Sequence, residues 1–215
     1  MIIFNQVEKY KNGARILNKI SFQINQNEFV IFYSNDDNVL SALRKLLSTE
    51  SNPDNGLIKV SNKYDHKKDF FDNKIGIVYQ QNILLNDRKL TENCKFILNV
   101  KNIARDYFQK RIDRVLELVD LEFAKNLTPK ELLPHQLVRA NIAQALLNYP
   151  SLLIIEKPTL NLDEVNSKGI IHLLETINNY GITVVLLSNN KKLVNGNNTG
   201  RVIFLEKGEV LAEKV

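Results

Sequence analysis

The last third of the chain alternates short apolar segments with segments that have a helical period. The apolar stretches 151–156, 182–187 and 201–206 are separated by predicted helices at about 163–179 and 190–194. Continuous apolar strands that alternate with helices are typical of a largely parallel sheet covered by helices on both faces. The alternation therefore predicts an α/β fold.

The first third of the chain reads mainly as strands. Apolar patterning and turn signals predict strands at 1–10, 16–25 and 28–33, which we expect to form an antiparallel addition to the parallel sheet. A leucine-rich stripe with helical spacing predicts a helix over about Asn38–Leu47. The sequence "SNPDNG" at 51–56 then predicts a turn.

The middle of the chain changes from a strand to a helical region. A strand is predicted at 74–79, and no repeat or long linker follows it. We therefore expect one domain, 1–215, with a helical subdomain inserted at about 91–148. The predicted helices of this region are about 91–99, 105–119 and 133–148.

Composition narrows the functional classes. The longest apolar runs are far shorter than the roughly 20 residues of a membrane-spanning helix, and no signal-like segment opens the chain, so a cytoplasmic location is expected. The net charge of +5 is scattered along the chain without a concentrated basic helix, which argues against nucleic-acid binding. A mildly basic protein suits the anionic inner face of a membrane.

Cysteine and histidine offer little for catalysis or metal binding. The single cysteine, Cys94, excludes an internal disulfide and a cysteine metal cluster, and we expect a packed thiol. The three histidines, His66, His135 and His172, are isolated along the chain. No metal ligand is therefore assigned.

Two motifs carry a family resemblance. The segment "IGIVYQQNILLNDRKLTEN" at 75–93 and the turn "PTLNLD" at 158–163 resemble those of the ATP-binding cassette ATPases, in an order that extends over residues 1 to about 212. The most specific part, "LLNDR" at Leu84–Arg88, resembles the cell-division subgroup FtsE. Lipoprotein-release and macrolide-type cassettes share related motifs and stay open as alternatives.

The resemblance implies a fold, ligands and partners. It implies a nucleotide-binding fold of the P-loop type with a helical subdomain, and ATP with Mg²⁺ as the ligands of the family. It also implies an FtsX-like integral membrane protein as partner, a position at the inner face of the cell membrane, and a homodimer or a heterodimer with another cassette.

The phosphate-binding loop departs from the family pattern. In GxxxxGK[ST], glycines let backbone N–H groups face the phosphates, the lysine neutralises them and the hydroxyl binds Mg²⁺. The equivalent segment is "SNDDNVLS", Ser34–Ser41. Ser34 and Val39 replace the glycines, Leu40 replaces the lysine, and only the hydroxyl of Ser41 remains.

Two carboxylates stand where phosphates would lie. Asp36 and Asp37 would repel a triphosphate, so we expect no bound nucleotide and no cofactor. An acidic cap on the following helix is the simplest role for this segment. We also predict that Lys157, or another cation, lies close to Asp36 or Asp37 and neutralises the pocket from within.

The strand at 151–156 leads into the second altered motif. In the family, an Asp at its end holds Mg²⁺ and the next Glu polarises the attacking water; the equivalents here are Glu156 and Lys157. A lysine ammonium has no lone pair with which to accept a proton. We therefore expect no general base at this position and no catalytic residue.

The signature and switch motifs differ as well. The family's LSGGQ is replaced by "LLPHQ", in which Leu133, Pro134 and His135 remove the hydroxyl and both glycines. Asn189 stands at the switch histidine. Gln136 and Arg139 persist in the signature helix.

Other equivalent positions are retained. Tyr10 stands at the adenine-stacking position, although a packed aromatic is an equal alternative, and the family's metal positions are Ser41, Gln80 and Glu156. The turn and dimer-contact loop matches the family at Pro158, Thr159, Asn161, Leu162 and Asp163, of which Asn161 and Asp163 are also ordinary helix-capping types.

Three hypotheses follow from these residues. The first is a pseudo-ATPase that acts as an adaptor in cell division and docks through Gln80–Arg88 and the helix that follows to Val100. The second is a residual ATP-binding or hydrolysing subunit of an FtsE- or lipoprotein-release-type transporter, in which Lys157 substitutes for the loop lysine. The third is a chain that folds but has no further role.

Overall fold

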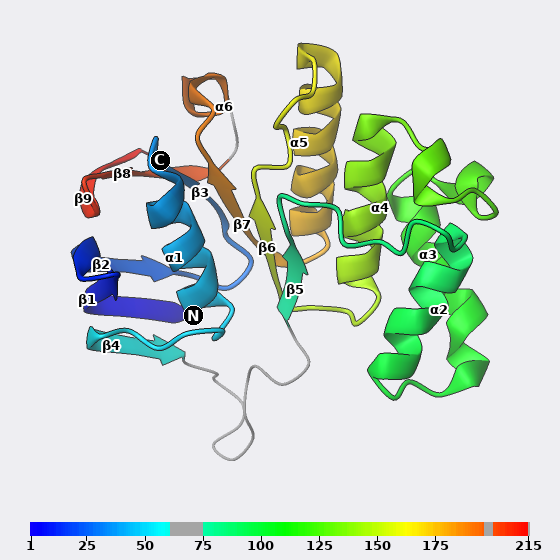
Figure 1. Cartoon of the computed structure of the whole chain (residues 1–215), viewed down its shortest axis with the longest axis horizontal. Helices are drawn as coiled ribbons and strands as arrows, with labels where there is room; N and C mark the ends of the chain where they lie inside the picture. Colours follow the sequence, from blue (N-terminus) through cyan, green and yellow to red (C-terminus); the bar gives the residue numbers. More distant parts are fainter. Residues whose placement is uncertain (61–74, 196–199, 215) are drawn as a thin grey trace.

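The computed structural model describes residues 1–60, 75–195 and 200–214. A small antiparallel sheet lies at one end, a larger and mostly parallel sheet crosses the middle, and a group of helices forms the other end (Figure 1). The α/β class predicted from the sequence is confirmed.

The antiparallel sheet contains three strands in the order β2-β1-β4. The prediction for 51–56 was partly wrong, because the chain enters a strand at Asn55 rather than ending the turn at Gly56. This strand lies at the sheet edge with mostly exposed residues, so it lacks the apolar run by which the others were found. The strands are β1 (Ile2–Lys11), β2 (Ala14–Ile24) and β4 (Asn55–Val60).

The central sheet has six strands in the order β5-β6-β7-β3-β8-β9. The first five run parallel, and β9 pairs antiparallel with β8. The expectation that all N-terminal strands form the antiparallel addition was wrong for the third, because β3 pairs in parallel with both β7 and β8. The strands are β3 (Phe29–Tyr33), β5 (Ile75–Val78), β6 (Leu152–Glu156), β7 (Thr183–Ser188), β8 (Arg201–Glu206) and β9 (Glu209–Lys214).

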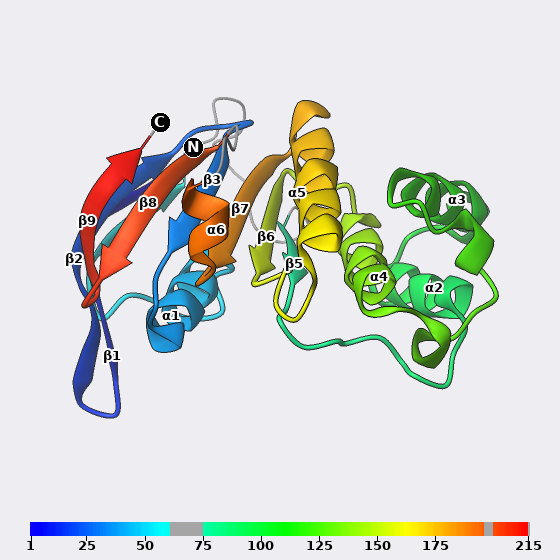
Figure 2. The same cartoon turned by 90° about the horizontal axis from the view of Figure 1, so that it is seen from above.

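Alternate residues of the central strands feed two separate cores. Val30 and Phe32 of β3 face a core shared with β1, β2 and the first helix, whereas Phe29 and Ile31 face a core shared with the later helices. Both faces are covered, which explains why these strands read as continuous apolar runs. Figure 2 shows the first helix and the fifth helix on opposite faces of the sheet. These helices are α1 (Asp37–Leu47) and α5 (Glu164–Asn179).

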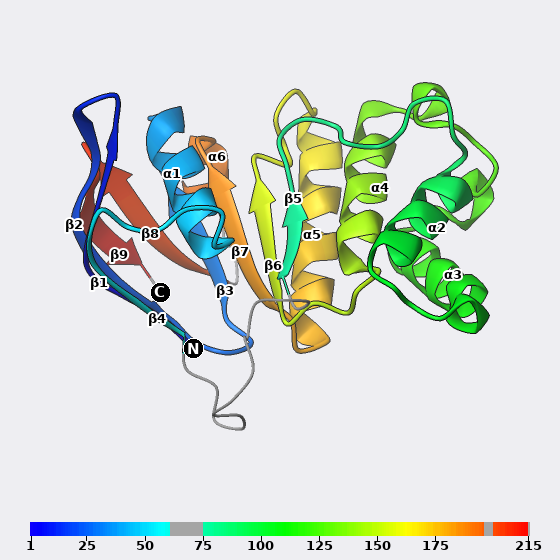
Figure 3. The same cartoon turned by 60° about the horizontal axis from the view of Figure 1, so that its bottom comes forward.

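Three of the remaining helices gather beyond β5, at the end of the molecule opposite the antiparallel sheet, whereas the short helix that follows β7 packs against β3 (Figure 3). The segment predicted as one helix at 105–119 is a short 3₁₀ turn, Arg105–Tyr107, followed by an α-helix. Cys94 is buried among these helices, which confirms the packed thiol, and burial raises its pKa to about 12. The α-helices are α2 (Leu90–Val100), α3 (Phe108–Leu118), α4 (Pro134–Leu146) and the short α6 (Lys191–Asn195). The other 3₁₀ turns are Glu122–Ala124 and Pro129–Glu131.

Candidate functional site

The altered motifs meet at one edge of the central sheet. Neighbouring parallel strands β6, β7 and β3 end there, so the loops after their carboxyl ends lie together. The backbone N–H of Ser34 donates to the carbonyl of Ser188 at 3.1 Å, and that of Lys157 donates to the carbonyl of Leu187 at 2.8 Å. These bonds connect the loops that follow the three strands.

The loop after β3 is capped by its own side chains. Asp36 is the N-cap of α1, and its Oδ1 accepts from the backbone N–H of Asn38 at 2.8 Å, which confirms the acidic cap. Ser34 Oγ accepts from the N–H of Asp36 at 3.1 Å. Val39 and Leu40 are buried in the core between α1 and the sheet, while Ser41 is partly exposed. The position equivalent to the family's lysine therefore belongs to the core.

A lysine from the neighbouring strand's loop reaches the start of α1. Lys157 Nζ lies 2.5 Å from Asp37 Oδ1, and the Lys157 side chain is only 4% exposed. This contact confirms the predicted neutralisation of the loop by Lys157. Asn189 Nδ2 also donates to Asp37 Oδ1, at 3.4 Å. Asp37 thus contacts both residues that stand at the family's catalytic glutamate and switch histidine.

The backbone of Lys157 has an uncommon conformation. Its φ is +46°, in the left-handed region that favours glycine, and its carbonyl accepts from the N–H of Leu160 at 3.1 Å. A non-glycine residue in this region carries a cost on the order of 1 kcal/mol. The turn therefore holds Lys157 in place at some expense in backbone energy.

A second ion pair, which the sequence analysis missed, holds Glu156. Arg44 of α1 is 6% exposed; its Nε lies 3.2 Å from Glu156 Oε2 and its Nη1 lies 2.5 Å from Glu50 Oε1. The guanidinium also lies 5.0 Å from the ring centroid of Tyr79. The sequence could have indicated this pair, because Arg44 is a charged residue beside Leu43 on the helix face that packs against the core. A buried charge needs a partner.

These contacts shift the protonation of the groups involved. Burial opposes the charge of Arg44, but the hydrogen bond and charge of Glu50, with the charge of Glu156, raise its pKa. Burial also disfavours ionised Glu50, yet hydrogen bonds from Arg44 and Ser48 hold the pKa of Glu50 below its usual value of 4.5. Both charges are therefore present at neutral pH.

The lowered pKa of Glu50 predicts acid sensitivity. Because its pKa is lower in the folded than in the unfolded state, Glu50 stabilises the fold above pH 4.5 and loses this contribution as the pH falls through the folded value. The free energy of unfolding of wild type and Glu50→Gln should be measured by urea denaturation between about pH 7 and pH 3. We expect wild type to be more stable at neutral pH and the difference to shrink below pH 4.5; a constant difference would contradict this.

The signature segment forms the start of α4. Leu133 is the N-cap, Pro134 is the first helical residue, and Gln136 Oε1 accepts from the N–H of Leu133 at 2.9 Å. Proline suits this position because the first N–H of a helix has no partner within the helix. Gln136 thus caps its own helix, and the Leu133 side chain is exposed.

Gln80 and the turn after β6 line a small pocket. Gln80 is exposed at its rim, and Asn141 Nδ2 donates to Asn82 Oδ1 at 3.1 Å across it. The pocket has a volume of about 190 Å³ and is lined by both polar and apolar side chains. Its wall includes Gln80, Asn82, Asn141, Glu156, Lys157 and Asn161.

The remaining predicted residues take ordinary structural roles. Asp163 caps α5, accepting from the N–H of Asn166 at 2.8 Å, whereas Asn161 has a left-handed backbone and is not a cap. Tyr10 is 40% exposed at the end of the β1–β2 hairpin. That end lies near α1, because Lys11 Nζ donates to Asn38 Oδ1 at 2.8 Å.

The other residues that match the family's turn and signature helix make structural contacts. Thr159 is buried, Leu162 packs against the core that contains α5, and Pro158 lines the small pocket. Arg139 Nη1 binds the Val119 carbonyl at 2.9 Å and Asp120 at 2.7 Å. These residues hold the turn and α4 in place.

A buried asparagine that the sequence analysis did not single out organises the segment before α2. Asn93 is 1% exposed, and its Oδ1 accepts from the N–H of Leu85 at 2.7 Å. Its Nδ2 donates to the carbonyls of Leu85, Arg88 and Lys89 at 3.0–3.2 Å. One side chain therefore fixes the loop that carries the "LLNDR" segment.

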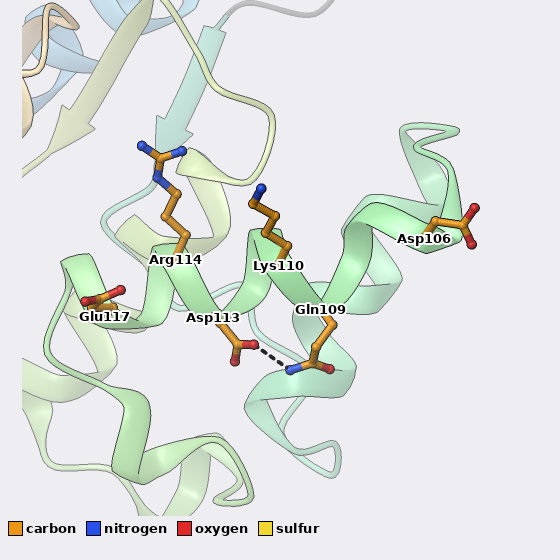
Figure 4. A pocket seen from close by; sticks show the side chains of 6 residues that line it. All are labelled: Asp106, Gln109, Lys110, Asp113, Arg114 and Glu117. Carbon is orange, nitrogen blue, oxygen red and sulfur yellow. Dashed lines mark hydrogen bonds between the residues drawn. The ribbon is translucent and has the colours of Figure 1, made fainter.

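No group of side chains suited to a metal was found among the described residues. His135 is half-buried at the start of α4, and His172 is exposed on α5. His66 lies outside the described residues. A separate hollow runs along the outer face of α3, where side chains of alternating charge point to both sides of one helix (Figure 4). None of the motif residues described above lines it.

Comparison with known proteins gave consistent matches. The family described as "ABC transporter" matches residues 17–160. The chain is 34% identical to the cell division ATP-binding protein FtsE of Bacillus subtilis, over all of this chain and 96% of that protein. It is 31% identical to FtsE of Mycobacterium tuberculosis, with the same shares of both chains.

Solved structures agree with the fold. The dimeric post-hydrolysis structure of the ATP-binding cassette MJ0796 bound to ADP and phosphate superposes with a TM-score of 0.81 at 27% identity, covering 100% of this chain and 98% of the other. The cbiO1 subunit of an ABC transporter complex from Clostridium perfringens has a TM-score of 0.87 at 24% identity, covering 99% and 87%. The latter supports the fold alone.

Proposed function

The chain belongs to the ABC transporter family of ATPase cassettes, and from this we propose that it is an FtsE-like cassette that works as an adaptor without hydrolysing ATP. It would dock on the cytoplasmic side of an FtsX-like membrane protein and have a structural or regulatory role in cell division. No helix among the described residues is long and apolar enough to cross a membrane. We place the protein in the cytoplasm, held at the membrane by its partner.

The ion pair between Lys157 and Asp37 carries this proposal. The ammonium at the family's catalytic position lies 2.5 Å from a carboxylate of the phosphate-loop segment, so neither group is available for a nucleotide. A water molecule near Lys157 would meet a cation that cannot accept its proton. The arrangement favours a site occupied by the chain's own ion pair over a site that performs catalysis.

Glu156 gives independent support. A carboxylate that binds Mg²⁺ must be free to face the ion, but Glu156 is paired with the buried guanidinium of Arg44. Of the family's metal positions, Ser41 keeps a hydroxyl and Gln80 lies exposed at a pocket rim. We propose that the chain holds neither Mg²⁺ nor ATP.

Pairing with another subunit would not restore a site. The resemblance implies composite sites that take the phosphate loop from one cassette and the signature from the other. A homodimer would lack both parts at each site, because Leu40 and Pro134 occur in both copies. A heterodimer with an intact cassette would lack one part at each site.

Nucleotide titration tests the proposal. We expect isothermal titration with Mg-ATP up to about 1 mM to give no binding heat, since no loop lysine is present and Asp37 stands in the loop. The Bacillus subtilis relative, whose name describes it as ATP-binding, serves as the positive control. Micromolar binding to this chain would overturn the no-nucleotide part of the proposal.

Docking needs its own measurement. The chain and a tagged FtsX-like protein from the same genome should be co-expressed and purified in detergent. We expect the two to elute together without added nucleotide. Separate elution would overturn the adaptor role at the membrane and leave the nucleotide result untouched.

A residual ATPase is the second candidate, favoured by the burial of Lys157. A buried ammonium beside the phosphate-loop segment could take the place of the missing loop lysine in an FtsE- or lipoprotein-release-type transporter. Phosphate release by wild type, Lys157→Ala and Glu156→Gln separates the candidates. Activity that disappears in both variants would support the residual enzyme and overturn the pseudo-ATPase.

A further inference from the structure

An exposed apolar strip extends from the loop after β5 along α2. Ile83 is 48% exposed, Leu85 39%, Phe96 43% and Val100 59%. The opposite side of α2 is buried through Leu90, Cys94 and Leu98. These four exposed residues and the basic residues around them are called the α2 surface below.

The strip is held together by the loop and the helix. Phe96 and Val100 are one turn apart and share a face of α2. Asn93 binds both the N–H and the carbonyl of Leu85, which fixes Leu85 at the start of the same helix. The guanidinium of Arg88 lies 6.0 Å from the ring centroid of Phe96. These contacts connect the loop to α2, and Phe96 and Val100 lie on one face of that helix.

The basic residues around the strip have no ion-pair partner among the residues that the structure describes. Two carboxylates of the same sequence segment have other partners: Asp87 pairs with Lys130 at 2.6 Å, and Glu92 accepts from the backbone N–H of Lys89 at 2.9 Å. Asp106 is the one other carboxylate between positions 85 and 107. The exposed, unpaired cations are Arg88, Lys89, Lys95, Lys101 and Arg105.

We propose that the α2 surface binds a segment of the membrane partner in which apolar side chains are flanked by carboxylates. The inference rests on the proposed docking role and adds the chemistry of the partner. Apolar contact along the strip would supply affinity, and the cations would select and orient an acidic segment. The partner is thus expected to be acidic where it meets this chain.

A pocket adjoins one end of the strip, which favours a protein segment over a lipid surface as the binding partner. The N–H of Ile83 lies 3.5 Å from Asn141 Oδ1, so Ile83 adjoins the pocket of about 190 Å³ that Asn82 and Leu137 line. A concave pocket beside an apolar strip can receive a side chain of a helix or loop. An anionic bilayer would need no such pocket.

Defined peptides test the chemistry. The probe is a labelled amphipathic peptide of about 18 residues with leucine on one face and glutamate on the other; a second peptide has lysine in place of glutamate. We expect anisotropy to show at least tenfold tighter binding of the acidic peptide at about 50 mM salt, weakening as salt increases. Equal binding of the two peptides would overturn the inference.

Matched variants locate the binding. Lys95→Glu/Lys101→Glu should weaken binding of the acidic peptide about tenfold, whereas Lys45→Glu/Lys59→Glu, with the same change in net charge, should leave it within about twofold. Phe96→Ser should also weaken it, and Tyr180→Ser at the end of α5 should not. Equal effects of the two charge pairs would show general attraction to a basic protein and overturn the assignment.

Two arms separate this inference from its alternatives. Vesicles of neutral lipid with about 30% anionic lipid test whether the α2 surface binds a membrane instead. Tighter binding to these vesicles than to the acidic peptide, if it is lost in Lys95→Glu/Lys101→Glu, would overturn the proposal of a protein partner. In the co-purification experiment, equal recovery of the FtsX-like protein with wild type and with this variant would retain the docking role and overturn the acidic partner.

Discussion

Replacing Arg44 by methionine should lower the free energy of unfolding by about 3 kcal/mol. The guanidinium is almost fully buried and is the cation that meets both Glu50 and Glu156. Methionine keeps much of the volume but leaves two carboxylates without their cation. Urea denaturation at neutral pH measures the loss.

Two variants check the cause. Lys45→Met, at the exposed next position of α1, should change stability by no more than about 0.5 kcal/mol. Arg44→Lys should cost about 1–2 kcal/mol, since a single ammonium cannot reproduce the planar fork that reaches both carboxylates. An Arg44→Met variant as stable as Lys45→Met would show that the ion pairs contribute nothing.

Asp37→Asn should lower the free energy of unfolding by about 2 kcal/mol, because it leaves the buried Lys157 ammonium without its carboxylate. The effect is smaller than for Arg44 since the Asp37 side chain is 65% exposed and water can partly replace it. Lys157→Met should cost only about 1 kcal/mol, because it removes the buried charge itself.

The adjacent carboxylate gives a matched control. Asp36→Asn should cost no more than about 0.5 kcal/mol, since asparagine caps a helix nearly as well as aspartate. In the double variant Asp37→Asn/Lys157→Met, the loss should be less than the sum of the single losses by at least about 1 kcal/mol. Additive losses would contradict a direct interaction between the two residues.

The predictable part of the fold was the part with regular apolar periods. The buried strands of the central sheet and the main helices show such periods, and they formed close to their predicted bounds. Strand β4 and strand β9 are edge strands with mostly exposed residues, so their sequences resemble turns and loops. The parallel pairing of β3 is a contact with strands more than 150 positions away, which no local pattern reveals.

The same limit applies to the site. The Lys157–Asp37 contact could be predicted because both residues stand at motif positions that the family brings together, with opposite charges. Arg44 belongs to no motif, and its two carboxylates come from different segments. In the sequence, Asn93 is only one polar residue within a predicted helix, because its role depends on backbone groups of a loop whose shape it determines.

The close approach of Lys157 to Asp37 also constrains the order in which substitutions can accumulate. A glutamate acquired at position 157 would place a buried carboxylate beside that of Asp37, and the like charges would repel. It would also inherit the left-handed backbone. Such a change alone would be selected against on stability. Position 37 would have to change first, so the effect of a substitution at position 157 depends on the residue at position 37.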